Sequence, residues 1–271
     1  MGPAFGDRRH PEPGEPQPHS AKHPENTGNL RVSTLLRSLI RSVGNLAGEF
    51  DVIELSQQLL EACLDSTDAA DAGLLLADQR GDLRILAASA ERQELLDLLQ
   101  LGAVDGPSAQ AYRGMSPAAL DDLGGTAHES PEFGRCALAA GYRSAYALPL
   151  RLQRDCIGAL AIFGASTAAL DDADIGVGQV LADLAGIGIA HYIVLAQVGT
   201  VYAQLPAVLN NRIAIDQAKG VLAERDSSDM DRAFQRMRGH ARATGVRLAD
   251  LAADIVDGRI DTADVGIEPP D

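Results

Sequence analysis

The sequence has no tryptophan, few other aromatic residues and only three cysteines among its 271 residues. Cys63, Cys136 and Cys156 are an odd number without a CxxC spacing, which argues against a disulfide framework or a zinc knuckle. Buried structural thiols are the simpler interpretation, and a redox or metal sensor is the alternative. The six histidines do not cluster with the cysteines, so we predict no metal site.

Long apolar runs are also missing. No run reaches the roughly 20 residues of a membrane-spanning helix, and the Pro- and Gly-rich start lacks the apolar core of a signal peptide. We therefore expect a cytoplasmic protein. Residues 1–29 have almost no aliphatic side chains, so we expect disorder there. Residues 30–45 predict an amphipathic helix that packs on the next domain or on a partner copy, with binding at a membrane surface as the alternative.

Basic residues are scarce. The chain has 23 Lys and Arg against 38 Asp and Glu, a net charge of −15, which argues against a protein that coats nucleic acid along its whole length. The imbalance is local. Residues 46–195 carry 8 basic against 22 acidic side chains, or −14, whereas residues 205–260 carry 9 against 8, or +1. Contact with phosphate is therefore expected only in the C-terminal part.

Residues 46–170 alternate between helical and strand-like patterns. Helical patterns run from Val52 to Leu64 and from Glu91 to Leu101. The polar turn Gln79–Asp82 joins two apolar runs, which predicts a hairpin, and a second hairpin follows later. The four runs that read as strands are 72–78, 83–89, 144–152 and 156–164. We predict an α+β domain in which an antiparallel sheet is flanked by helices.

This domain resembles a GAF domain of the kind found in actinobacterial regulators. The segments that carry the resemblance are FDVIELSQQLLEACL, AGLLLADQRGDLRILAAS, GPSAQAYRGMSPAALDDL and GYRSAYALPLRLQRDCIGALAIF. The resemblance implies either a small-molecule pocket beside the sheet or a domain that only dimerises and transmits signals. Candidate pocket residues, each equally consistent with a core or surface position, are Tyr112, His128, Phe133, Tyr142 and Tyr146. We predict no cofactor and leave the identity of a small-molecule ligand open.

Residues 171–204 predict a helical linker. From Val177 to Val208, apolar residues recur at spacings of three and four over more than four heptads, the pattern of a parallel two-stranded coiled coil. This seam predicts a homodimer, although several glycines weaken it by about 1 kcal/mol each. His191 lies on the seam, either to fix the register or as a pH-sensitive element. Pro206 is expected to kink the helix or to begin a new one.

Residues 205–260 predict a bundle of three helices, followed by an acidic tail over 261–271. The expected helices run from Pro206 to Glu224, from Met230 to Thr244 and from Leu248 to Val256. The bundle is too small and too poor in catalytic groups for an enzyme, and no Ser/His/Asp set or P-loop occurs elsewhere. We therefore predict a regulator without catalytic activity.

The bundle resembles an ANTAR domain, the RNA-binding output of bacterial antitermination regulators. The resemblance lies in Arg212, Ile215, Asp216, Gln217, Ala218, Lys219 and Gly220, in Ala233, Phe234, Met237, Arg238, Ala241 and Arg242, and in Leu248, Ala249, Asp250 and Ala252. It implies binding to a pair of RNA stem-loops that overlap a transcription terminator. The candidate RNA-binding residues are Asn211, Arg212, Gln217, Lys219, Gly220, Arg238, Arg242 and Arg247.

Together these patterns predict a signal-responsive, dimeric antitermination regulator of the GAF-ANTAR type. A DNA-binding regulator is one alternative, because three small helices can also form a helix-turn-helix. Against it, the third helix carries Asp250 and Asp254, with Asp257 just after it, and these carboxylates would repel phosphate. A sensor or scaffold that acts only through protein partners is the other alternative.

Overall fold

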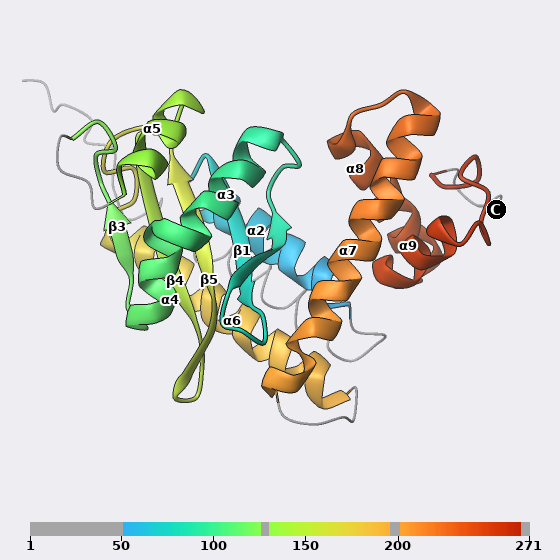
Figure 1. Cartoon of the computed structure of the whole chain (residues 1–271), viewed down its shortest axis with the longest axis horizontal. Helices are drawn as coiled ribbons and strands as arrows, with labels where there is room; N and C mark the ends of the chain where they lie inside the picture. Colours follow the sequence, from blue (N-terminus) through green and yellow to red (C-terminus); the bar gives the residue numbers. More distant parts are fainter. Residues whose placement is uncertain (1–50, 126–129, 196–200, 267–271) are drawn as a thin grey trace, which may run out of the picture.

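The structure is a computed structural model that describes residues 51–125, 130–195 and 201–266 (Figure 1). The expected disordered segment 1–29 and the amphipathic helix 30–45 lie outside the described residues, as does His128. The helices are α2 (Val52–Ser66), α3 (Gln93–Asp105), α4 (Pro107–Gly114), α5 (Pro131–Ala139), α6 (Asp172–Leu195), α7 (Val201–Asp226), α8 (Met230–Thr244) and α9 (Leu248–Val256). The strands are β1 (Asp71–Ala77), β2 (Leu83–Ala88), β3 (Ala118–Leu120), β4 (Ser144–Leu152) and β5 (Asp155–Gly164).

The five strands form one antiparallel sheet in the order β2-β1-β5-β4-β3. Both predicted hairpins, β1–β2 and β4–β5, are confirmed. The first closes around Gly81, whose φ of +82° is the left-handed conformation that glycine adopts without strain. The strands read as nearly continuous apolar runs because both faces of the sheet are covered.

Helices cover the sheet on both sides (Figure 1). On one face, α2 and α6 pack over a core that includes Leu60, Leu74 and Ile162. On the other face, α3, α4 and α5 enclose a second core around Phe133, Phe163 and Leu99. The three-layer α+β architecture predicted from the sequence is therefore confirmed, and β2 is left as an edge strand.

Helix α6 is apolar for much of its length. Its stretch Asp172–Tyr192, 21 residues with a mean hydropathy of 1.4, is long and apolar enough to cross a membrane, contrary to the expectation that no such run exists. Leu181, Ala185 and Ile189 of this stretch are buried against the sheet and α2. This part of its hydrophobicity belongs to the core of the domain, and 44% of the apolar window is buried.

The predicted seam does not run through one straight helix. Asn211 Nδ2 donates a hydrogen bond of 3.1 Å to the hydroxyl of Tyr192, whereas 19 residues of continuous helix would separate them by about 28 Å. The structure therefore corrects the expectation of a continuous helix over 171–208: α7 turns back along the end of α6. The seam positions on α6 lie in two different environments: Leu184 packs on the core of the domain, whereas Val180 and Ile187 are exposed.

The C-terminal helices form a bundle beside the β2 edge of the sheet (Figure 1). Helices α8 and α9 have the predicted bounds, but α7 begins at Val201 and contains Pro206 in its first turns, where the proline had been expected to kink or begin a helix. Ile213 and Val256 are exposed, although both are apolar residues of these helices. Residues 261–266 of the expected tail pack on α8, where Val265 is fully buried.

Gly158 of β5 gives a test of the sheet. A Cβ atom there would lie 2.1 Å from the carbonyl oxygen of Leu75 on β1, so Gly158→Ala must push two central strands apart. We expect the free energy of unfolding to fall by about 1–3 kcal/mol. In Gly176→Ala, on the exposed side of α6, the new methyl group meets no atom within 4 Å, and we expect a gain of up to about 1 kcal/mol. Urea unfolding of both variants measures the difference, and equal stabilities would contradict this packing.

Candidate nucleic-acid interface

The candidate RNA-binding cations lie on α7 and α8, whose local sequences define their ends and inner faces. Helix α8 begins at Asp229, whose carboxylate accepts the backbone N–H of Arg232 (2.7 Å), and it ends at Gly245 in the left-handed conformation. Phe234 and Met237 turn into the bundle. This leaves four cations of the two helices on the sides that meet the α+β domain, namely Arg212, Lys219, Arg238 and Arg242.

Arg212 and Lys219 of α7 bind one carboxylate of the α+β domain. Seven residues complete about two helical turns, so both side chains lie on the same side of α7. Arg212 Nη2 donates to both carboxylate oxygens of Glu91 (2.9 and 3.0 Å), and Lys219 Nζ donates to Glu91 Oε2 (2.7 Å). Glu91 lies between β2 and α3. All three side chains are almost completely buried, with 1–6% of their surface exposed.

Two further groups complete this first cluster. Asp216, also on α7, binds Arg212 Nε at 3.2 Å and Lys219 Nζ at 2.7 Å. The Lys219 ammonium also lies 5.4 Å from the centre of the Phe234 ring. Arg212 Nη1 is buried without a hydrogen-bond partner among the described residues. A buried donor left unsatisfied in this way costs about 1–3 kcal/mol, so the cluster is well neutralised but imperfectly satisfied.

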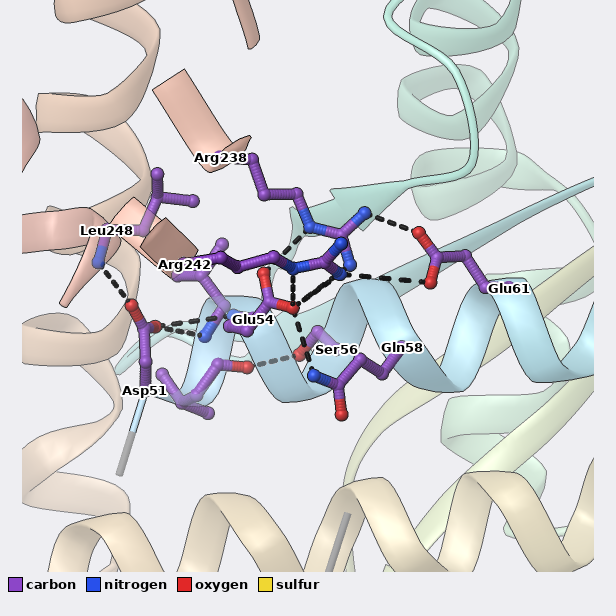
Figure 2. A network of polar contacts seen from close by, with 10 residues as sticks. Asp51, Glu54, Ser56, Gln58, Glu61, Arg238, Arg242 and Leu248 are labelled. Carbon is purple, nitrogen blue, oxygen red and sulfur yellow. Dashed lines mark hydrogen bonds and ion pairs between the residues drawn. The ribbon is translucent and has the colours of Figure 1, made fainter. Parts of the chain in front are cut away.

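Arg238 and Arg242 of α8 form a second cluster with two glutamates of α2 (Figure 2). Arg238 Nε donates to Glu54 Oε2 (2.7 Å), and its Nη1 donates to Glu61. Arg242 donates to Glu54 Oε1 through Nε (2.9 Å) and Nη2 (2.7 Å). Arg238 is 3% exposed, whereas the Arg242 side chain is half exposed. The second cluster therefore pairs two cations with two carboxylates of the other domain, whereas the first has one such carboxylate, Glu91, and one of α7 itself, Asp216.

The pKa values in the second cluster follow from these contacts. Burial alone would raise the pKa of Glu54, but hydrogen bonds and the charge of Arg238 outweigh it and hold that pKa below its ordinary value. Burial likewise favours neutral Arg238, but the two glutamates outweigh burial and raise its pKa. Both groups therefore stay charged at neutral pH.

Asp51 forms a third polar contact between the two domains (Figure 2). Its Oδ1 accepts the backbone N–H groups of Ile53 (2.9 Å) and Glu54 (3.3 Å) at the start of α2, and its Oδ2 accepts that of Leu248 (2.6 Å) at the start of α9. One carboxylate thus caps two helices from different domains. Burial is the largest influence on the pKa of Asp51 and leaves it raised, although these hydrogen bonds lower it.

The remaining RNA-binding candidates lie outside these clusters. Asn211 contacts Tyr192 of α6, Gln217 is exposed, and Arg247 pairs with Asp250 one turn along α9. A Cβ atom on Gly220 would meet nothing within 4 Å, so close helix packing does not require glycine there. The structure therefore brings together the pairs Arg212–Lys219 and Arg238–Arg242. Asn211 and Arg247 line one small cavity of about 40 Å³ beside Asp51, and Gln217 and Gly220 lie apart from these groups.

Among the described residues, the candidate pocket residues of the α+β domain are divided between the two faces of the sheet. Phe133 and Tyr142 belong to the core on the α3 side, where both stack near Phe163, whereas Tyr146 belongs to the core on the α2 side. Tyr112 lines a small cavity of about 240 Å³ beside β2. A larger cavity of about 810 Å³ lies between the two domains, walled by β2 and α3 on one side and by α7 on the other.

Sequence reasoning missed the acidic partners Asp51, Glu54, Glu61 and Glu91. One signal was available, because Glu54 and Glu61 are seven residues apart and therefore lie on the same side of a helix. Both glutamates contribute to the negative net charge of residues 46–195, but no pattern in the sequence indicates that they contact α8. For Glu91 we find no sequence signal.

The fold and the site define a two-domain regulator in which acidic residues of an α+β domain hold the cationic side of a helical module. A family model for the GAF domain matches residues 51–190, and a model for the ANTAR domain matches residues 203–256. The first match alone spans more than half of the chain. The protein therefore belongs to the GAF domain family, and its GAF domain is joined to a C-terminal ANTAR domain, as the sequence predicted.

The two domains also define the general kind of function. ANTAR domains are RNA-binding modules of antitermination, and GAF domains are signal-sensing modules, so the chain is a regulator of this general kind. In this protein four cations of the ANTAR domain pair with glutamates of the GAF domain, namely Arg212, Lys219, Arg238 and Arg242.

Solved structures with a similar fold are GAF domains and a reductase. The GAF domain of a phosphoenolpyruvate-protein phosphotransferase from Coxiella burnetii has 16% identity and a TM-score of 0.48, over 61% of this chain and 98% of that one. The free methionine-R-sulfoxide reductase of Neisseria meningitidis, in complex with its substrate, has 20% identity and a TM-score of 0.46, over 63% and 93%. A comparison with curated proteins finds no match.

The double role of Asp51 predicts an unusually large effect of removing it. Asp51→Ala deletes the caps of α2 and α9 together, and each cap contributes about 0.5–2 kcal/mol. We expect Asp51→Ala to lower the free energy of unfolding about twice as much as Asp229→Ala, which removes only the cap of α8. Thermal unfolding of both variants measures the ratio. Equal losses would show that the bond to Leu248 contributes nothing.

Proposed function

We propose that the protein binds RNA stem-loops through the cationic side of its ANTAR domain and thereby controls transcription antitermination. The observation that supports this is a set of four cations on the side of the ANTAR domain that contacts carboxylates of the GAF domain. They are Arg212, Lys219, Arg238 and Arg242. Guanidinium groups that grip carboxylates in a forked geometry are equally suited to phosphate. Asn211, Gln217, Gly220 and Arg247 lie outside the clusters and are proposed to contact bases or backbone beside them.

A pair of stem-loops is best bound by two linked ANTAR domains, because linkage makes the second binding event intramolecular. We therefore propose a homodimer. Its contact uses the exposed seam positions Val180 and Ile187, which are one heptad apart on α6. A signal received by the GAF domain then changes the access of RNA to the ANTAR domains, and the RNA-bound form lets polymerase pass the terminator.

Catalysis is not part of the proposal, although some proteins of similar fold are enzymes. Cys63 and Cys156 are buried, and burial raises the pKa of the Cys63 thiol to about 11, so the reactive thiolate is disfavoured at neutral pH. We place the protein in the cytoplasm, where nascent transcripts are available. A DNA-binding regulator remains the second candidate and is separated from the first by the experiment below.

The experiment is a gel shift of the full chain with an RNA that carries two adjacent hairpins, a scrambled RNA and a DNA duplex. We expect preference for the hairpin RNA. Arg242→Gln, which removes a half-exposed cation, should weaken binding and lower the slope of log affinity against log salt by about one unit. Arg259→Gln is the matched control, because Arg259 pairs with Asp254 and Asp257 away from the two clusters.

Two results would contradict the proposal. Equal binding of hairpin and scrambled RNA, both with and without added cell extract as a source of the signal, would show that the protein does not recognise hairpin RNA specifically. Preference for the DNA duplex would favour the DNA-binding alternative.

A further inference from the structure

We propose that Glu54, Glu61 and Glu91 form a surface of the GAF domain that competes with RNA for the cations of the ANTAR domain. The conformation described is then the form that excludes RNA, and release of this surface exposes the RNA site. This inference rests on the proposed RNA function and specifies how binding at that same site is regulated.

The first support is burial of the proposed RNA-binding groups. Lys219, Arg238 and Arg212 are only 1, 3 and 5% exposed, although charged side chains of these types are rarely buried unless paired. Their pairing partners across the contact are Glu91, Glu54 and Glu61. RNA cannot reach these three cations until the two domains separate. Docking to the GAF domain and binding to RNA are therefore mutually exclusive.

The second support is the balance of charge. In the docked form the four cations of the two clusters face four carboxylates, namely Glu54, Glu61, Glu91 and Asp216. Separation removes the three glutamates and leaves Asp216 as the carboxylate paired with these cations, because it belongs to α7 itself. Asp231 of α8, which accepts the Glu91 backbone N–H at 3.3 Å, also stays on this face. Four cations and two carboxylates leave a surplus of +2 on the face of the ANTAR domain. Opening therefore turns a neutralised contact into a surface that attracts phosphate.

The third support is that the contact leaves a cavity and an unsatisfied donor, although apolar residues of α2 and of the ANTAR bundle share one hydrophobic core. A cavity of about 810 Å³ separates α7 from β2 and α3, and Ile213 and Met230 on its walls are exposed. Arg212 Nη1 has no partner among the described residues. Buried ion pairs fix geometry more than they add stability, because desolvation offsets their attraction. Such a contact opens when a competing polyanion or a signal shifts the equilibrium.

The fourth support is the position of Glu91 within the GAF domain. Its neighbour Arg92 donates to Asp71 and to the Tyr142 hydroxyl, and Tyr142 belongs to the aromatic core beside Phe163. Tyr142 in turn donates to Asp71 (2.7 Å). Arg92 directly follows Glu91 in the chain, so a rearrangement of this core is transmitted through one residue to the carboxylate that binds Arg212 and Lys219. A signal sensed in the GAF domain can therefore change the glutamate surface.

The test compares three full-length proteins: the wild type, the triple variant Glu54→Gln/Glu61→Gln/Glu91→Gln and a charge-matched control. The control Glu94→Gln/Glu132→Gln/Asp155→Asn removes three exposed carboxylates from the same domain, so it corrects for weaker overall repulsion of RNA. Small-angle X-ray scattering without RNA measures opening. Hydrogen exchange at the start of α9 gives a second readout, because the Leu248 amide is bonded to Asp51 only when the domains are docked.

We expect the triple variant to be open and to bind the hairpin RNA about 10-fold or more tightly than the wild type, with a change of less than about 2-fold in the control. Circular dichroism checks the fold of each variant, and the single variant Glu91→Gln should show an intermediate effect if the triple variant does not fold. Thermodynamic reciprocity adds a test without substitutions: saturating RNA must remove the protection at the start of α9 in the wild type.

The outcomes separate the two proposals. A triple variant that stays docked, or one that opens and binds RNA no more tightly than the control, overturns the competition while the RNA function stands. An open triple variant that still does not prefer hairpin over scrambled RNA overturns the RNA function, whatever the state of docking.

Discussion

The structure depends on one buried carboxylate, that of Glu91. A carboxylate with 1% of its side chain exposed needs cations beside it, and Arg212 and Lys219 supply them. Both cations come from the same side of α7, so this helix must lie along the β2 edge of the sheet. Helices α8 and α9 are packed on α7, so their contacts with α2 follow from the same placement. The orientation of the two domains is thus set by charge neutralisation, by the shared cap of Asp51 and by the hydrophobic core that α2 shares with the bundle.

Local patterns in the sequence were enough for most of the fold. Helices α8 and α9 have the bounds predicted from periodicity and from the cap residues Asp229 and Gly245, because capping and amphipathicity act within a few residues. Both hairpins were predicted for the same reason, since a short polar turn between apolar runs specifies antiparallel pairing locally. The seam of α6 did not decide its own role, because a repeat of three and four describes equally well a helix that packs on its own domain and one that pairs with a partner copy.

The candidate site was only partly predictable for a physical reason. Arg212 and Lys219 are charged residues on an amphipathic helix, and sequence reasoning places such residues in solvent, where they normally lie. Their burial depends on Glu91, more than 120 positions away in the chain. The acidic excess of the GAF domain indicates that partners for cations exist, yet a total of charges does not say which carboxylate meets which cation. Contacts between distant segments decide this, and they follow from the packing of whole domains.

Asp216 explains how one face of the ANTAR domain can serve two partners. It contacts Arg212 and Lys219 from within α7, so both side chains keep one ligand when Glu91 withdraws. Lys219 is also held over the ring of Phe234, a contact inside the bundle. The cations are therefore oriented before any RNA arrives, and the entropy lost on binding is smaller than for free side chains. A carboxylate of the GAF domain and a phosphate of RNA would then meet the same preformed set of donors, which makes exchange between them a competition at one site.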